Sequence, residues 1–187
     1  MKKITVISLL LVSALIGCAT SNEVSTPEKS AYNRAVEAWR SKNYVLARQL
    51  WSAAIVEGAN DEAYNNLGHL LYYGLGGAED AKQAVNLFRK GAALGVSEAQ
   101  RHLGVAFEEG RGVKINYAQA YAWYKCAVAT AGANKANEPI EETIEKDSKA
   151  AMEAISLKMT ITDRVEGDRL ANIYISKYAS RLALLTL

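Results

Sequence analysis

The chain has 187 residues, half of them hydrophobic, and its 22 basic and 20 acidic residues nearly balance. This balance, without a basic stripe or an acidic tail, gives no support to a nucleic-acid-binding surface. Two prolines, 13 glycines and few β-branched runs favour an all-helical protein.

The first 18 residues carry the features of an export signal. Lys2 and Lys3 form a positive region, residues 4–16 are apolar, and the small residue Gly17 precedes Cys18. About 20 apolar residues are needed to span a bilayer, so this run is too short for a transmembrane anchor. The pattern predicts a signal peptide over residues 1–17.

The segment Leu15-Ile16-Gly17-Cys18 resembles the lipobox of bacterial lipoproteins. The resemblance implies that the thiol of Cys18 takes a diacylglycerol and that cleavage makes Cys18 the acylated first residue of the mature protein. Ala19, in place of Asp, favours an outer-membrane location facing the periplasm by resemblance to enterobacterial sorting. The alternative is an ordinary signal peptide with an incidental cysteine. Residues 18–29 then form a flexible, polar tether.

The body of the chain is an internal repeat with an offset of 36 residues. The residues Ala63, Leu67, Gly68, Gly74 and Gly76 recur as Ala99, Leu103, Gly104, Gly110 and Gly112. Further along, Ala84, Phe88 and Ala92 fall opposite Ala120, Tyr124 and Val128. So many matches at one fixed offset predict two copies of one helix–turn–helix unit.

The spacing within a unit explains the residue types. Ala63 and Leu67 lie four residues apart and share one helical face. Gly68 costs about 1 kcal/mol relative to Ala in a helix, which predicts a neighbouring helix packed against it. Gly74 is expected to end the first helix in a left-handed conformation. Gly95 and Gly132 are expected to end the second helices.

These motifs, especially Gly110-Arg-Gly112-Val113 and Trp123-Tyr124-Lys125, resemble the Sel-one-like repeat (SLR), a relative of the tetratricopeptide repeat. Lys42-Asn43-Tyr44 resembles a tetratricopeptide turn and marks an earlier unit. The resemblance implies an all-α fold, a short right-handed α-solenoid with a C-terminal helical cap. The expected units are 30–60, 61–96 and 97–132, followed by a helical extension over 133–187.

The extension is expected to cover the open face of the last repeat, because terminal repeats need a cap. Its first helix is expected over Ile140–Met159, after Pro139. Thr162 is the expected N-cap of a last helix running from Asp163 towards Leu184, with Leu170, Ile173, Tyr174 and Tyr178 on its apolar face. The apolar end, 182–187, either docks on the domain or meets a partner.

The sequence offers no catalytic constellation, cofactor motif or metal site. His69 and His102 have no further ligand at a zinc spacing. Glu108-Glu109 and Glu141-Glu142 are neighbours whose side chains diverge on a helix, so they are expected on a solvated surface. Cys126 lies inside a helical pattern, where a small buried residue is expected rather than a redox thiol.

The first helices of stacked repeats line the concave side of a solenoid, and in tetratricopeptide proteins their non-core positions meet ligands. Carried onto this chain, the resemblance gives a candidate partner groove of Tyr32, Val36, Trp39, Arg40, Glu62, Asn65, His69, Tyr72, Tyr73, Arg101, Val105, Glu108 and Glu109. Aromatic side chains and Arg are enriched at interface hot spots. The alternative is that Trp39, Tyr72 and Tyr73 pack between units as core residues.

Three functions stay open at this point. The first is a membrane-anchored periplasmic adaptor or scaffold that binds a protein or peptide of unknown identity. The second is a lipoprotein that assists assembly of pili or outer-membrane proteins. The third is a β-lactam-binding or hydrolysing enzyme of the cysteine-rich SLR branch, which bridges its helices with cysteine pairs that this chain does not carry.

Overall fold

The computed structural model describes residues 30–58, 60–134 and 139–179. The expected signal peptide, Cys18, the tether and the apolar end at 182–187 lie outside the described residues. The described part contains eight α-helices, a terminal π-helical turn and no strand. The elements are α1 (Ala31–Arg40), α2 (Tyr44–Glu57), α3 (Glu62–Tyr72), α4 (Ala81–Ala93), α5 (Ser97–Glu109), α6 (Tyr117–Asn134), α7 (Ile140–Ser156), α8 (Ile161–Tyr174) and η1 (Ile175–Ala179). None of these helices is both long and apolar enough to cross a membrane.

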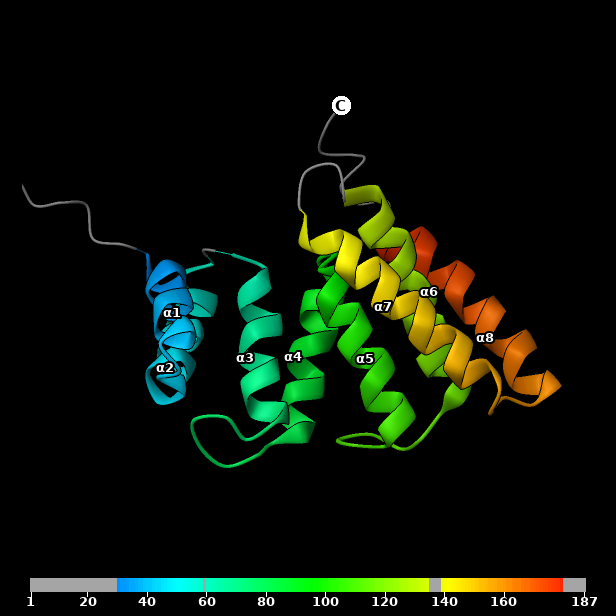
Figure 1. Ribbon diagram of the computed structural model, residues 1–187, viewed down its shortest axis with the longest axis horizontal. Coiled ribbons are helices and arrows are strands. Elements are labelled where there is room, and N and C mark those ends of the chain that lie inside the picture. Colours follow the sequence, from blue (N-terminus) through cyan, green and yellow to red (C-terminus); the bar gives the residue numbers. More distant parts are fainter. Residues whose placement is uncertain (1–29, 59, 135–138, 180–187) are drawn as a thin grey trace, which may run out of the picture.

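The helices follow one another in a row, from α1 and α2 at one end to α8 at the other (Figure 1). Helix α1 packs on α2, α3 on α4, and α5 on α6, while contacts between α2 and α3 and between α4 and α5 join successive pairs. This is the α-solenoid of stacked helix pairs that the 36-residue repeat predicts.

Each second helix of a pair begins at a short polar side chain. Asn43 accepts a hydrogen bond from the backbone N–H of Leu46 at 3.3 Å, and Asp80 accepts one from Gln83 at 2.8 Å. Asn116 does the same for the backbone N–H of Gln119, at 2.9 Å. Such caps satisfy donors that a helix leaves unpaired at its N-terminus.

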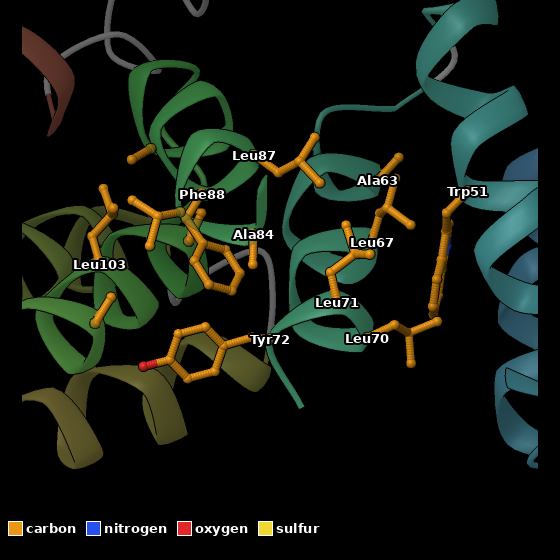
Figure 2. Close-up of a cluster of buried hydrophobic side chains, with 14 of the residues drawn as sticks. Trp51, Ala63, Leu67, Leu70, Leu71, Tyr72, Ala84, Leu87, Phe88 and Leu103 are labelled. Carbon is orange, nitrogen blue, oxygen red and sulfur yellow. The ribbon is translucent and has the colours of Figure 1, made fainter. Parts of the chain in front are cut away.

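Buried alanines let the helices approach closely, and large side chains fill the spaces that remain. Ala63 and Ala84 are fully buried, as is the ring of Phe88. Figure 2 shows Trp51 standing between α3 and the first helix pair, with Leu67, Leu70 and Leu71 on the α3 side. The core is therefore continuous from one pair to the next.

The two mid-helix glycines perform the same packing task in successive units. A Cβ added at Gly68 would lie 2.6 Å from Cε1 of Phe88, and one added at Gly104 would lie 2.5 Å from Cδ1 of Tyr124. The expectation of a neighbouring helix at these glycines is confirmed, and the contact is with an aromatic ring. Glycine is needed because any side chain would occupy the space of that ring.

The loop glycines fasten each unit to the preceding one. Gly76 and Gly112 have φ angles of +77° and +75°, which L side chains rarely adopt. A Cβ at Gly76 would clash with the backbone of Tyr44, and one at Gly112 with the carbonyl of Ala81. Each loop therefore packs against the start of the preceding unit's second helix.

The C-terminal extension continues the row of helices and then departs from the repeat. Helix α7 packs on α6 and touches α5, as the first helix of a further unit would. Helix α8 also packs on α6. Lys125 Nζ of α6 and Asp168 Oδ1 of α8 are 2.7 Å apart. The Tyr174 hydroxyl donates to Gln119 Oε1 at 3.0 Å. The extension thus caps the solenoid from two sides.

Three details of the expected C-terminal helices are wrong. Helix α6 continues through Gly132 to Asn134, because nothing at this glycine forces a left-handed conformation. The N-cap of α8 is Thr160 and not Thr162, because Thr160 and Asp163 exchange hydrogen bonds in a capping box. Ile173 is 45% exposed, since α8 turns its small residues Gly167 and Ala171 towards α6.

Candidate binding groove

A groove runs between the first helices of the units and the start of α7. Its main cavity has a volume of about 470 Å³. The cavity is lined by Tyr32, Val36, Trp39 and Arg40 of α1, Trp51 of α2, Asn65, Asn66 and His69 of α3, Glu98 of α5 and Ile140 of α7. We call this surface the first-helix groove. It unites six of the predicted binding residues, namely Tyr32, Val36, Trp39, Arg40, Asn65 and His69.

A second cavity of about 370 Å³ extends the groove. It shares Tyr32, Asn66, Glu98 and Ile140 with the first cavity, and it adds the predicted residue Glu62. A larger cavity of about 660 Å³ is lined by residues of α7 alone, all charged except Ala150. Because a single helix lines it, this third cavity is an open helix face and not a site.

Two adjacent residues of α1 give the groove its aromatic and cationic character. Trp39 is 45% exposed although it is a large hydrophobic side chain. Arg40 is also exposed, and among the described residues its guanidinium has no ion-pair partner. An exposed indole beside an unpaired cation is typical of an interaction surface.

A buried network of polar side chains around Asn65 connects α3 and α5 at the groove. Its Nδ2 donates to Glu98 Oε2 at 3.1 Å, so its Oδ1 is free to accept from His102 Nδ1, 2.8 Å away. Nε2 of His102 then accepts from Arg101 Nη2 at 3.2 Å. This chain of hydrogen bonds links α3 to α5 and fixes His102 as the neutral Nδ1–H tautomer.

Both histidines are neutral in this environment. Burial holds the pKa of His102 well below its usual value, and the cationic Arg101 lowers that pKa further. Burial also lowers the pKa of His69, against the opposing effect of Glu98. The ring of His69 lies 4.8 Å from that of Tyr73 and 5.4 Å from that of His102. His102 therefore serves packing and hydrogen bonding, and His69 packs against neighbouring rings.

Tyr72 is a core residue, and its assignment to the groove is wrong. Its side chain is 1% exposed, and its ring packs beside Phe88 at 5.9 Å between centroids. The guanidinium of Arg111 lies 4.2 Å over the same ring, and the hydroxyl donates to Glu109 Oε2 at 2.9 Å. Residues of the next unit therefore cover Tyr72, which Figure 2 shows among the buried side chains near Phe88. Tyr73 is 44% exposed but does not line the cavity.

The predicted residues of α5 also lie outside the groove. Arg101 is half-buried and engaged with His102, and Val105 packs against the core. Glu108 accepts hydrogen bonds from the Tyr124 hydroxyl and Lys158 Nζ, both at 2.9 Å. Glu109 accepts from Tyr72. As expected, the two neighbouring carboxylates diverge, but both stabilise the fold instead of forming a free surface.

Four groove residues are absent from the sequence prediction. The sequence pattern indicates only a core role for Trp51. Nothing in the sequence distinguishes Asn66, which follows Asn65, as a groove residue. Glu98 and Ile140 enter the groove because α5 and α7 follow the curve of the solenoid. Ile140 belongs to the extension, whose packing no repeat pattern predicts.

The described residues contain no group of three or more His, Cys, Asp or Glu side chains that could hold a metal ion. Cys126 is buried, and burial raises the pKa of its thiol to about 12. Its thiol is therefore protonated and unreactive at neutral pH. Within the described part, the arrangement can bind a partner but offers no activated nucleophile.

The comparisons with known proteins agree with this architecture. The Sel1 repeat family matches residues 61–96 and 97–129, which contain the helix pairs α3–α4 and α5–α6. The chain thus contains two Sel1 repeats over these residues. Sel1 repeats are helical-repeat modules for protein interaction. No curated protein matches the chain.

Two solved structures share the fold. A protective antigen present in uropathogenic Escherichia coli strains, which displays an SLR fold, is 27% identical and superposes with a TM-score of 0.69. The match covers 80% of this chain and 30% of the antigen. A Sel1 repeat protein from Oxalobacter formigenes is 23% identical with a TM-score of 0.54, over 76% of this chain and 55% of that one. The chain therefore spans about a third and about half of these two proteins.

Proposed function

We propose that this Sel1-like repeat protein is a lipid-anchored adaptor of the cell envelope that binds a partner protein through the first-helix groove. The observation that carries the proposal is the groove itself, whose lining includes the 45% exposed indole of Trp39 and Arg40, a residue with no ion-pair partner among the described residues. Large hydrophobic side chains at an open cavity mark interaction sites. In this proposal the protein binds its partner and does not catalyse a reaction.

The anchoring half of the proposal rests on residues 1–29. Residues 1–17 act as the signal peptide, Cys18 carries the lipid, and the polar tether 18–29 connects it to α1. One acyl chain gives only marginal membrane binding, while several chains on one residue hold a protein stably. The anchor faces the periplasm from the outer membrane. The description of the E. coli relative as a protective antigen is in keeping with export from the cytoplasm.

Replacing Cys18 by Ser tests the anchor. The variant should lose metabolic labelling with radioactive palmitate and keep its signal peptide, because the peptidase acts on the lipidated cysteine. Labelling and electrophoretic mobility in whole cells measure both effects, and Cys126→Ser serves as the control because it removes the other cysteine. Palmitate labelling that persists in Cys18→Ser would exclude lipidation at this residue.

Photo-cross-linking in cells tests the groove. A benzophenone amino acid placed at Trp39 should give a discrete adduct, because this position faces the cavity. The control position is Val56, which is 88% exposed on α2 and does not line the cavity. Adducts of equal yield from both positions would indicate nonspecific contact, and an adduct from Val56 alone would place the binding surface elsewhere.

A further inference from the structure

The first-helix groove contains hydrogen-bond donors that lack acceptors among the described residues. The indole Nε1 of Trp51, a side chain that is only 3% exposed, is buried and has no hydrogen-bond partner among the described residues. A buried donor without an acceptor is unfavourable. Trp51 lines the same cavity as the unpaired guanidinium of Arg40. Of these two donors, the exposed guanidinium of Arg40 is the one that an occupant of the cavity can reach.

A third donor comes from α3. Asn66 Oδ1 accepts a hydrogen bond from Asn65 Nδ2 at 3.4 Å, which leaves the amide Nδ2 of Asn66 to donate. The carboxylate of the cavity, that of Glu98, is in contrast already engaged. Glu98 accepts from Asn65 through Oε2, and its Oε1 lies 3.6 Å from Arg101 Nη2. Among the described residues, the main cavity thus offers an occupant the positive charge of Arg40 and the amide of Asn66.

The rest of the cavity is apolar. Tyr32 and Val36 of α1 are half-buried, while Trp39 and Ile140 expose 45% and 59% of their surfaces at the rim. The cavity is lined by residues of α1, α3 and α5, so an occupant that fills it crosses three first helices.

Resting on the proposed function of the groove, we propose that its occupant is an extended segment of a partner protein in which an acidic side chain adjoins an aliphatic or aromatic one. The carboxylate pairs with Arg40, and the apolar side chain packs on Trp39 and Val36. Arg binds carboxylates with two parallel hydrogen bonds, which gives such a contact both strength and direction. The negative charge of this side chain complements Arg40, which has no ion-pair partner among the described residues.

A random peptide library displayed on phage, selected on the purified full chain in detergent, tests this assignment. Enriched peptides should share an acidic residue next to an apolar one. A synthetic peptide of that sequence should bind at least about tenfold more weakly when its acidic residue is replaced by the matching amide. Isothermal titration gives both dissociation constants.

Charge reversal at Arg40 sharpens the test. Selection on Arg40→Glu should enrich basic instead of acidic residues at the same place. The control is Arg89→Glu, because Arg89 is exposed on α4, lies outside the groove and undergoes the same change of charge. Selection on this control should again give acidic peptides.

The remaining outcomes separate this inference from the proposed function. Peptides that need Trp39 but neither Arg40 nor an acidic residue would overturn the inference and leave groove binding intact. Failure to enrich any peptide that depends on Trp39 or Arg40 would overturn both. Deletion of residues 19–27 provides the last test. A rise in peptide affinity of about tenfold would show that this chain's own N-terminal segment occupies the groove, and it would overturn the proposal of a partner segment.

Discussion

Replacing Tyr72 by Ala should destabilise the protein by about 3–5 kcal/mol, the usual cost of removing a buried aromatic side chain. The variant loses the contact with Phe88, the stacking of Arg111 and the hydrogen bond to Glu109. At roughly 2–4 °C per kcal/mol, the melting temperature should fall by roughly 6–20 °C. Circular dichroism during heating measures the change.

The adjacent tyrosine provides a matched control. Tyr73 is 44% exposed, so Tyr73→Ala should cost about 1 kcal/mol or less. Equal losses at the two positions would mean that Tyr72 does not carry the packing between units. The two variants also test whether Tyr72 is a core residue or a groove residue, because Tyr72→Ala should reduce binding only by unfolding the protein.

Gly104→Leu should destabilise the protein by about 1–3 kcal/mol through overpacking. The first atom of the new side chain would already lie 2.5 Å from the ring of Tyr124. That ring is 1% exposed and its hydroxyl donates to Glu108 at 2.9 Å, so it cannot move aside without losing this hydrogen bond. Thermal unfolding should show a fall of roughly 2–12 °C.

The same small substitution at two glycines isolates the effect of space. Ala is favoured over Gly within a helix by about 1 kcal/mol. Gly132→Ala should therefore stabilise the protein, because the nearest atom to its added Cβ would be 3.9 Å away in Glu145. Gly104→Ala should destabilise it. Stabilisation of both variants would show that Gly104 does not face the tyrosine ring.

The repeat could be predicted from the sequence because its constraints are local and periodic. Gly68 and Gly104 each face an aromatic residue 20 positions later, Phe88 and Tyr124. The same contact therefore requires a glycine and an aromatic residue at the same spacing in both units. The capping residues Asp80 and Asn116 repeat with the same offset of 36 residues. A fold built from such units can therefore be predicted from the repeat in a single sequence.

The exposure of individual aromatic residues could not be predicted in the same way. Trp39 and Tyr72 both lie near the end of a first helix, and sequence spacing gives them the same expected role. Tyr72 is buried because Arg111 and Glu109 of the following unit cover it, whereas Trp39 has no such cover among the described residues. Burial here depends on the contact between units, which spacing within a unit does not encode.

The contribution of α7 to the groove was also beyond the sequence pattern. The extension has no repeat partner, so its place could not be derived from the period. Ile140 reaches the cavity because α7 packs on α6 beside α5, and Ser97 Oγ donates to Glu141 Oε2 at 2.5 Å where the two helices begin. The cap of the solenoid is therefore also a wall of the groove.

The affinity of Trp39→Ala for the partner cross-linked at this position tests the central claim most directly. Loss of a hot-spot aromatic residue costs about 2 kcal/mol, so the dissociation constant should rise about 30-fold. The melting temperature should stay unchanged, because a 45% exposed side chain supports little packing. Val56→Ala should change neither quantity. A Trp39→Ala variant that folds normally and binds the partner at full strength would contradict the claim that the first-helix groove is the binding surface.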